Sequence, residues 1–310
     1  MKDRLGIVFM GSPEFSVPAL RALHERHRVL AVVTQPDRPK GRGRELQAPA
    51  VKLVAEDLGL PVLQPPKLRR PEARAELQTL GADLFVVVAF GQILSPAVLA
   101  IPPLGCLNIH ASLLPRYRGA APMQWAILRG ERETGVTIMQ MDAGVDTGPI
   151  LLQQSATIGA QETAGTLHDR LAPLGAELLV RALERLAAGD LPATPQEEGL
   201  ATHAPLLKKE DGRVDFSRSA RDVDCWIRGM DPWPGAFVQW EGEAVKVFQP
   251  RCDVGEGAPG EVLLVDHRGM LVACGEGAVW IGEVQRPGRR RMTVPALVAG
   301  RPLHLGTRIG

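Results

Sequence analysis

Two polar residues, Asn108 and His110, lie in one short apolar segment, Cys106–His110. If this segment is a β-strand, its side chains alternate between two faces, so the two polar residues project together while Leu107 and Ile109 face the other way. A polar pair at the carboxyl end of a strand lies where open α/β sheets bind their ligands. The pair could therefore serve catalysis. A hydrogen-bonded structural role for both side chains is the alternative interpretation.

A carboxylate, Asp146, follows a second apolar segment, in the run Met141–Gly148 (MDAGVDTG). An aspartate beside glycine often binds its own backbone in a turn. Alternatively, the loop carries Asp146 over the edge of a sheet to His110. Both interpretations stay open at this stage.

The first 190 or so residues alternate short apolar runs with amphipathic segments, which predicts a doubly wound, Rossmann-like and mostly parallel sheet. The expected strands are Leu5–Met10, Val29–Val33, Asp83–Phe90, Cys106–His110, Gly135–Met141 and Ile150–Ile158. The expected helices include Ala50–Leu58, Glu72–Leu80 and about Glu162–Ala188, the last with Thr163 as its N-cap. In such sheets ligands bind at the carboxyl ends of strands. Asn108 and His110 would lie at one of these ends.

Several common site types are missing from the sequence. The first strand ends in GSPEF instead of GxGxxG, and there is no P-loop, HExxH or GxSxG motif. The four cysteines, at positions 106, 225, 252 and 274, form no CxxC pair, which gives no zinc signature or disulfide framework. No apolar run approaches the roughly 18 residues that span a bilayer. The net charge of +1 neither requires nor excludes a nucleic-acid partner. We expect a cytoplasmic protein without metal, nicotinamide or membrane partner.

The pattern changes after the turn-rich segment that begins at Gly189. One helix, about Ala220–Gly229 with Ser219 as its cap, precedes a series of short strands. These are Ala236–Trp240, Val245–Gln249, Glu261–Val265, Leu271–Cys274 and Ala278–Val284. Five short strands with glycine-rich turns favour a small, OB-like β-barrel. We expect a first domain over residues 1–189, a linker over 190–206 and the barrel domain over 207–310.

The residues quoted so far resemble a known signature. Asn108, the run His110–Pro115 (HASLLP) and the later MDAGVDTG are similar to the motifs of the 10-formyltetrahydrofolate-dependent formyltransferases. Three further runs resemble the members of this family that formylate methionyl initiator tRNA. They are Thr34–Arg44, Gly135–Asp142 and Asp231–Gly235. The similarity covers essentially the whole chain, and none of the three polar positions departs from it.

The resemblance implies a reaction in which a neutral amine attacks the formyl carbon carried on N10 of the folate. Asn108 and protonated His110 would donate to the oxygen that gains negative charge. Asp146 would either favour the charged form of His110 or take the amine proton itself, and both versions stay open. The expected folate-pocket residues are Phe90, Gly91, Gln92, Ile93, Leu94, Ser112, Leu113, Leu114 and Pro115. Core packing is the alternative role for Leu113 and Leu114.

Two basic segments would bind the tRNA by the same resemblance. The loop Gln35–Glu45 would enter the acceptor end, with Arg42 contacting phosphate or base edges. Its basic residues are Arg38, Lys40, Arg42 and Arg44. The segment Arg286–Arg308 holds six arginines and no acidic residue, which suits the phosphate backbone. We single out Arg286, Arg289, Arg290 and Arg291. The alternatives are a solvated loop and a structural tail.

Three competing functions remain. A sugar-nucleotide N-formyltransferase would share the catalytic residues but would not need the two basic segments. A formylfolate hydrolase would use water in place of the amine. A non-enzymatic RNA-binding module would have no use for Asn108, His110 and Asp146 together. We therefore expect a monomeric enzyme that uses 10-formyltetrahydrofolate to formylate methionyl initiator tRNA.

Overall fold

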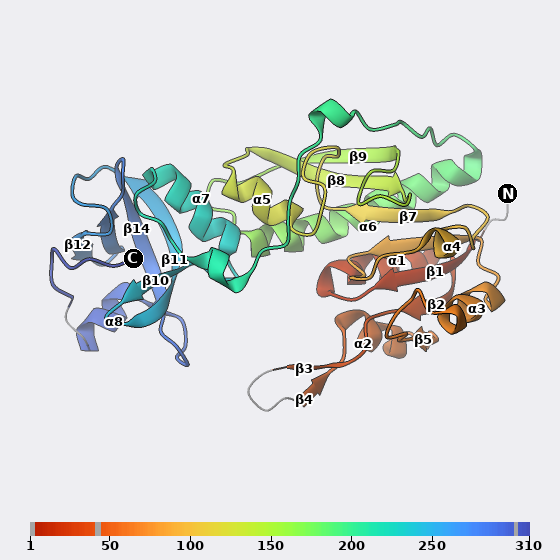
Figure 1. The fold of residues 1–310 in the computed structure, drawn as a ribbon, viewed down its shortest axis with the longest axis horizontal. Coiled ribbons are helices and arrows are strands. Elements are labelled where there is room, and N and C mark those ends of the chain that lie inside the picture. The colour runs from red at the N-terminus through yellow and green to blue at the C-terminus, as the bar shows by residue number, and fades with distance from the viewer. Residues whose placement is uncertain (1–3, 41–44, 301–302) are drawn as a thin grey trace. The chain divides into compact units, whose positions relative to one another are not determined.

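The computed structural model describes residues 4–40, 45–300 and 303–310 of the chain. It divides into two compact units, each made of several stretches of sequence (Figure 1). The first unit contains Met1–Gly119, Gly135–Ala156 and His168–His203. The second contains Ala120–Thr134, Thr157–Leu167 and Ala204–Gly310. The boundaries expected at residues 189 and 206 stay a prediction.

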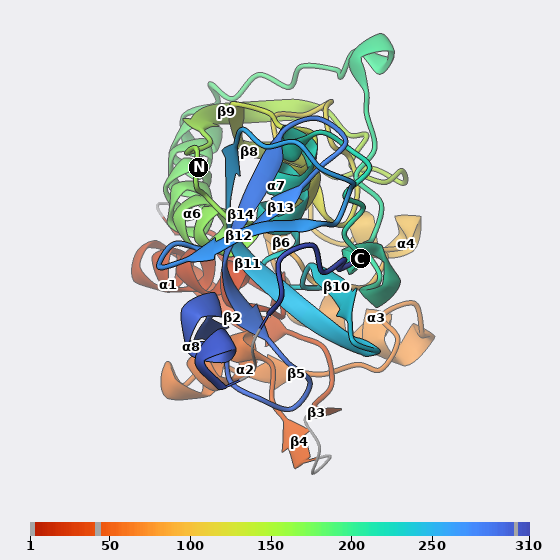
Figure 2. The same cartoon turned by 90° about the vertical axis from the view of Figure 1, so that its left-hand side faces the viewer.

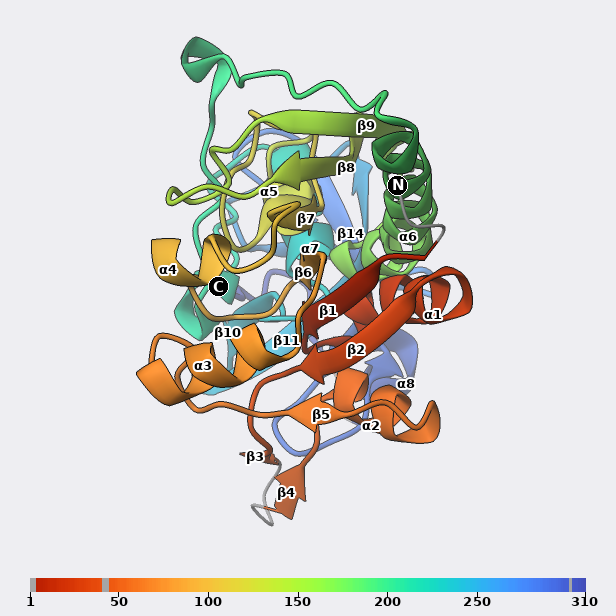
Figure 3. The same cartoon turned by 90° about the vertical axis from the view of Figure 1, so that its right-hand side faces the viewer.

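A seven-stranded sheet forms the first unit, with strand order β5-β2-β1-β6-β7-β8-β9 (Figure 3). The strands are β1 (Gly6–Gly11), β2 (Arg28–Val33), β5 (Val62–Leu63), β6 (Leu84–Val88), β7 (Cys106–His110), β8 (Glu133–Gln140) and β9 (Ile150–Thr157). Strands β5, β2, β1, β6 and β7 pair in parallel, whereas β8 runs antiparallel to β7. The predicted Rossmann-like, mostly parallel sheet is confirmed.

Helices cover both faces of this sheet. They are α1 (Val17–Arg26), α2 (Ala50–Asp57), α3 (Pro71–Thr79), α4 (Pro96–Leu99) and α6 (Ala164–Ala188). One buried cluster joins Phe85 and Cys106 of the strands to Leu77 of α3 and Val98 of α4. On the other face, a Cβ atom added to Gly175 of α6 would lie 2.9 Å from Cγ2 of Ile109. Glycine at this position therefore lets α6 approach strand β7 closely.

This packing tests the alternation expected for β7. Ile109 faces helix α6, and Cys106 belongs to the cluster with α3 and α4. Asn108 and His110 are in phase with Cys106, so they lie on the face opposite α6. The alternation seen at Cys106 and Ile109 therefore supports the common orientation predicted for Asn108 and His110.

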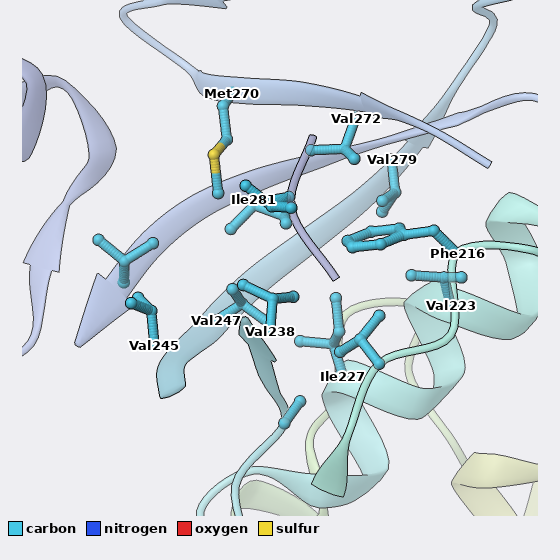
Figure 4. Packing of buried hydrophobic residues seen from close by; sticks show 14 of the residues in the cluster. Phe216, Val223, Ile227, Val238, Val245, Val247, Met270, Val272, Val279 and Ile281 are labelled. Atoms are coloured by element: carbon cyan, nitrogen blue, oxygen red, sulfur yellow. The ribbon is translucent and has the colours of Figure 1, made fainter. Parts of the chain in front are cut away.

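The second unit has its own antiparallel sheet and helices (Figure 2). Its strands are β10 (Phe237–Trp240), β11 (Glu243–Asp253), β12 (Val262–Asp266), β13 (Gly269–Ala273), β14 (Ala278–Gln285) and β15 (Met292–Thr293), and its helices are α5 (Pro122–Leu128), α7 (Ala220–Met230) and α8 (Val294–Gly300). As expected, Ser219 caps α7, because its Oγ accepts from the backbone N–H of Asp222 at 3.2 Å. Phe216, Val223, Ile227 and Ile281 share one buried core (Figure 4).

The sequence interpretation missed several short elements. The basic loop after β2 contains a small hairpin, β3 (Arg38–Lys40) paired antiparallel with β4 (Glu45–Gln47). Single 3-10 turns occur at η1 (Glu14–Ser16), η2 (Glu198–Leu200) and η3 (Lys209–Gly212). These elements are too short for apolar periodicity to reveal them. In the part of the chain that the structure describes, no helix has the length and apolarity to cross a membrane.

Candidate active site

Strand β7 carries two of the three predicted catalytic residues. It covers Cys106–His110, the segment expected from the sequence. Asn108 pairs in register with Val87 of β6 and Met139 of β8, and its side chain is half-buried. His110 ends the strand with 6% of its side chain exposed. Asn108 is therefore fixed by strands on either side of β7, and His110 pairs with Thr137 of β8.

The imidazole of His110 has a partner at each nitrogen. Its Nε2 lies 2.9 Å from the carbonyl oxygen of Tyr117. Because a carbonyl oxygen only accepts, this hydrogen bond requires the proton on Nε2. Its Nδ1 lies 3.6 Å from Oδ2 of Asp146, which is too long for a hydrogen bond but within the range of a charge interaction. A second proton, on Nδ1, would make an imidazolium beside a carboxylate.

Asp146 reaches His110 from the loop between β8 and β9. Its Oδ2 also accepts from the backbone N–H of Gly119 at 2.8 Å, and 17% of its side chain is exposed. The turn role considered for it belongs to Asp142, whose Oδ1 accepts from Gly144 N–H at 3.0 Å and from the Thr147 hydroxyl at 2.7 Å. The structure thus brings Asp146 to His110, as one of the two interpretations expected.

The segment after His110 is tied to strands β8 and β9. Thr137 donates its hydroxyl to the carbonyl of Ser112 at 2.6 Å and accepts from the backbone N–H of Leu114 at 3.1 Å. Gln153 donates to the carbonyl of Leu114 at 2.8 Å. No local pattern in the sequence marks Thr137 or Gln153, although Thr137 pairs in register with His110. These two side chains fix the shape of the predicted folate-binding loop.

The predicted folate-binding residues of this loop are mostly buried. Ser112 and Leu114 are buried, and Leu113 and Pro115 are half-buried. The hydroxyl of Ser112 donates to the carbonyl of Arg116 at 2.6 Å. The proton of the Ser112 hydroxyl is therefore already in use within the loop.

The other predicted folate-binding segment, Phe90–Leu94, follows the neighbouring strand β6. Phe90 and Leu94 are buried, Gly91 is exposed with a φ of 81°, and Ile93 is 83% exposed. The half-buried Gln92 accepts from Leu68 N–H at 2.7 Å and donates to the carbonyl of Pro65 at 3.0 Å. The two predicted segments therefore follow the carboxyl ends of adjacent parallel strands, where ligands bind to such sheets.

The base of the basic hairpin borders the Phe90 segment. Gln35 Nε2 donates to the carbonyl of Phe90 at 3.1 Å, and Ser12 Oγ donates to the same carbonyl at 3.2 Å. Ser12 and Gln35 also line a cavity of about 480 Å³ together with Arg38 and Leu53. Ser12 and Gln35 thus adjoin both the base of the hairpin and the predicted folate-binding segment.

Of the four basic residues expected in the hairpin, two are on described strand residues. Arg38 is exposed and donates to Gln35 Oε1 at 3.0 Å, and Lys40 ends β3. Arg42 and Arg44 lie outside the described residues. The hairpin base is held by Asp37, which accepts from Gln64 at 2.7 Å and from Lys52 at 2.8 Å. The Gln64 hydrogen bond and the Lys52 ammonium lower the pKa of Asp37.

In the arginine-rich segment of the second unit, some arginines form ion pairs and others are exposed to solvent. Arg286 forms a two-bond ion pair with Glu243 at 2.8 Å. Arg291 pairs with Asp231 at 3.4 Å and lies 3.9 Å above the ring of Phe248. Arg289 and Arg290 are exposed to solvent. The segment itself contains no acidic residue, but in the folded protein Arg286 and Arg291 form ion pairs with acidic residues from other parts of the chain.

The residue types that bind metals are scattered over the fold. Within the described ranges, no three His, Cys, Asp or Glu side chains are grouped so that they could hold a metal ion. Cys106 lies buried in strand β7, and burial raises the pKa of its thiol to about 12. Its thiol is therefore the neutral, unreactive form at physiological pH.

Two family models match the chain, one for each part. The model described as formyl transferase matches residues 5–183, and the model described as formyl transferase, C-terminal domain, matches residues 206–302. The chain therefore belongs to the formyl transferase family, which confirms the resemblance seen in the sequence. It is similar to the methionyl-tRNA formyltransferase of Citrifermentans bemidjiense, with 53% identity over 98% of this chain and 96% of the relative.

Solved structures share the fold at lower identity. An N-formyltransferase from Helicobacter canadensis, in complex with folinic acid and dTDP-3-aminofucose, is 18% identical with a TM-score of 0.68. The match covers 91% of this chain and 99% of that one. HypX from Aquifex aeolicus in complex with tetrahydrofolic acid is 21% identical with a TM-score of 0.66, and the match covers 99% of this chain. The chain spans about half of HypX, 51% of its length.

Proposed function

We propose that this enzyme transfers the formyl group of 10-formyltetrahydrofolate to the α-amino group of methionyl initiator tRNA. The observation that carries the proposal is the meeting of His110 and Asp146 at the end of the strand that bears Asn108. The choice of acceptor rests on the 53% identity with a methionyl-tRNA formyltransferase over nearly the full length of both chains.

The three side chains divide the work of acyl transfer among them. The amine nitrogen forms a bond to the formyl carbon, and the bond from that carbon to N10 breaks. The Asn108 amide and protonated His110 donate to the oxygen that becomes negative in between, and removing one such donor typically costs about 10²–10³ in rate. One proton leaves the amine and one arrives at N10. The proton that leaves the amine is balanced by the one delivered to N10, and the transfer runs through Asp146 and Nδ1 of His110, since His110 Nε2 is occupied by the carbonyl of Tyr117.

The residues at the two strand ends fit a folate. Its pterin ring has apolar faces and polar edges, so it needs an apolar slot with a few polar anchors. Phe90, Leu94 and Leu114 supply buried apolar side chains, and Ile93 presents an exposed one. We propose that Phe90–Leu94 and Ser112–Pro115 line the folate pocket; the proton of the Ser112 hydroxyl is not available to the folate, because it is donated to the carbonyl of Arg116.

The tRNA acceptor end would lie along the basic hairpin. Ser12 and Gln35, at the base of this hairpin, hydrogen-bond to Phe90 of the folate segment. The proposed contacts are Arg38, Lys40, Arg42 and Arg44. In the second unit we propose an OB-like barrel as the platform for the tRNA backbone, with the exposed Arg289 and Arg290 on its phosphates. Arg286 and Arg291 join them more weakly, because each would first leave an ion pair. We propose that the enzyme acts as a cytoplasmic monomer.

The test is formylation of methionyl initiator tRNA by the purified full-length chain with 10-formyltetrahydrofolate, read on an acid-urea gel. We expect conversion of initiator methionyl-tRNA and no conversion of elongator methionyl-tRNA. A parallel reaction contains dTDP-3-aminofucose, the sugar nucleotide bound by the Helicobacter canadensis structure. Formylation of the sugar in place of the tRNA would overturn the acceptor assignment. Release of formate without either acceptor would indicate a hydrolase.

A further inference from the structure

Residues 194–203, called the return segment here, lie against the active site. They belong to the stretch after α6 that the sequence analysis interpreted as a linker, and the structure assigns them to the first unit. The return segment begins on strand β9, where Thr194 and Ile150 exchange two backbone hydrogen bonds of 2.8 Å. It ends beside Tyr117 and Arg118, where Arg118 forms a parallel bridge with His203. It therefore passes along the loops that surround His110.

Gln196 of the return segment holds the loop that carries Asp146. Its Nε2 donates to the backbone carbonyl of Asp146 at 2.8 Å and to that of Gly148 at 2.7 Å. Its Oε1 accepts from Nε of Arg118 at 3.0 Å. Both amide protons and the amide oxygen are thus in use. Asp146 has a φ of 55°, which is uncommon for a residue other than glycine and persists only when the surroundings hold it.

Thr202 of the return segment holds the other partner of His110. Its hydroxyl accepts from the backbone N–H of Tyr117 at 2.8 Å. Its carbonyl accepts from the backbone N–H of Arg118 at 2.8 Å. Tyr117 has a φ of 61° and supplies the carbonyl that accepts from His110 Nε2. The strained residue on this side is therefore held by the same segment.

Arg118 joins these two contact points. It is only 4% exposed, and its guanidinium donates to Glu198 at 2.9 and 3.0 Å as well as to Gln196. Two-bond arginine–carboxylate pairs fix direction as well as distance. The return segment is thereby fastened to the chain directly after Tyr117.

We propose that Gln196 and Thr202 are positioning residues for formyl transfer, which place Asp146 and the Tyr117 carbonyl on the two nitrogens of His110. The inference rests on the proposed function. Neither residue touches the reacting atoms; each holds one of the two groups that orient the imidazole. A misplacement of about 1 Å far from the reacting atoms can cost about 10² in rate. The segment expected to be a linker would then be part of the catalytic apparatus.

Two matched sets of variants test the proposal. Gln196→Glu keeps the side-chain shape but replaces both N–H donors by an oxygen that repels the carbonyls of Asp146 and Gly148. Thr202→Val keeps the shape and removes the hydroxyl, whereas Thr202→Ser retains it. Glu197→Gln, at the exposed neighbouring position, changes the charge by one unit without touching the loops. The assays measure kcat, KM for each substrate, melting temperature and the ¹⁵N spectrum of His110.

We expect kcat to fall by about 10–100-fold in Gln196→Glu and Thr202→Val, with KM for folate within about twofold of the wild-type value. Thr202→Ser recovers most of the rate, and Glu197→Gln equals the wild type. The ¹⁵N chemical shifts of the imidazole should move in the two impaired variants, because a ring nitrogen that carries a proton and one that carries a lone pair have different shifts. Displacing a partner of either nitrogen should change where the protons lie. The ¹⁵N spectrum can be recorded without any enzymatic activity. A wild-type protein that does not formylate the tRNA would therefore refute the proposed function, while the positioning of His110 by Gln196 and Thr202 could still be tested.

The proposal is overturned if Gln196→Glu and Thr202→Val keep a kcat within twofold of the wild type. It is also overturned if Thr202→Ser is as impaired as Thr202→Val, because volume and not the hydroxyl would then matter. Unchanged His110 spectra in both impaired variants would have the same meaning. If Gln196→Glu does not fold at the assay temperature, the Thr202 pair decides.

Discussion

The end of strand β7 and the segment Arg286–Arg291 both concentrate polar side chains, but in opposite ways. At β7, His110 is buried and its partners come from the loops around residues 117 and 146, which Thr202 and Gln196 hold in turn. At Arg286–Arg291, two arginines form ion pairs and Arg289 and Arg290 are exposed. The first arrangement depends on the position of single atoms. The second depends mainly on how much positive charge faces solvent.

The largest expected effect is at β7. His110→Ala and Asn108→Ala should each lower turnover by about 10²–10³, because each removes a donor to the developing negative charge. Folate binding should survive, since neither side chain belongs to the proposed folate pocket. Single-turnover formylation and equilibrium dialysis of the folate measure the two quantities. Near-wild-type rates in both variants would show that the reaction does not depend on these two side chains, and β7 would then not differ from the arginine segment in its need for exact geometry.

The arginine segment should respond to charge count and not to geometry. In the double variant Arg289→Gln/Arg290→Gln, the dependence of tRNA binding on log salt should become shallower by about one for each phosphate that an arginine no longer neutralises, with kcat unchanged. Arg286→Gln is the matched control, because it removes the same kind of charge but leaves Glu243 without its ion pair. Since it removes one charge instead of two, we expect it to change the salt dependence by less than half as much as the double variant does. Equal slopes for wild type and double variant would argue for a structural tail.

The smallest expected effect concerns Asp37, a polar side chain of the first unit at the base of the basic hairpin. The pKa of Asp37 is lowered by the hydrogen bond from Gln64 and by Lys52. Its contribution to stability is therefore present above the pKa of the unfolded chain and is lost as pH falls through the lower, folded pKa. Gln64→Leu should raise the pKa of Asp37 toward its ordinary value.

Carboxyl ¹³C titration by NMR measures this shift. Asp253 in the second unit serves as the internal reference, since its pKa is lowered by the separate hydrogen bond from Trp280. Both aspartates moving together would point to global unfolding, and an unmoved Asp37 would show that Gln64 does not hold the hairpin base.

The sequence alone predicted the strand Cys106–His110, its alternation and the sheet around it, because these follow from local apolar patterns. It did not predict Thr137, Gln196 or Thr202. Their hydrogen bonds join residues 25 to 85 positions apart, and no local pattern reports such a contact. It also left the role of Asp146 open, since an aspartate beside glycine often binds its own backbone in a turn. The pairing of Arg286 with Glu243 was hidden for the same reason, as they are 43 positions apart.

The discontinuous second unit restricts how such a protein can be rearranged in evolution. Helix α5 lies before β8 in the sequence, yet its Trp125 and Leu128 pack against the core that contains Val223 and Ile227 of α7. A gene fragment that starts at residue 204 would encode α7 without α5 and leave this apolar surface open to water. Exchange of the C-terminal region by recombination at one junction is therefore disfavoured. We expect acceptor preference in this lineage to change through point substitutions, with both units inherited together.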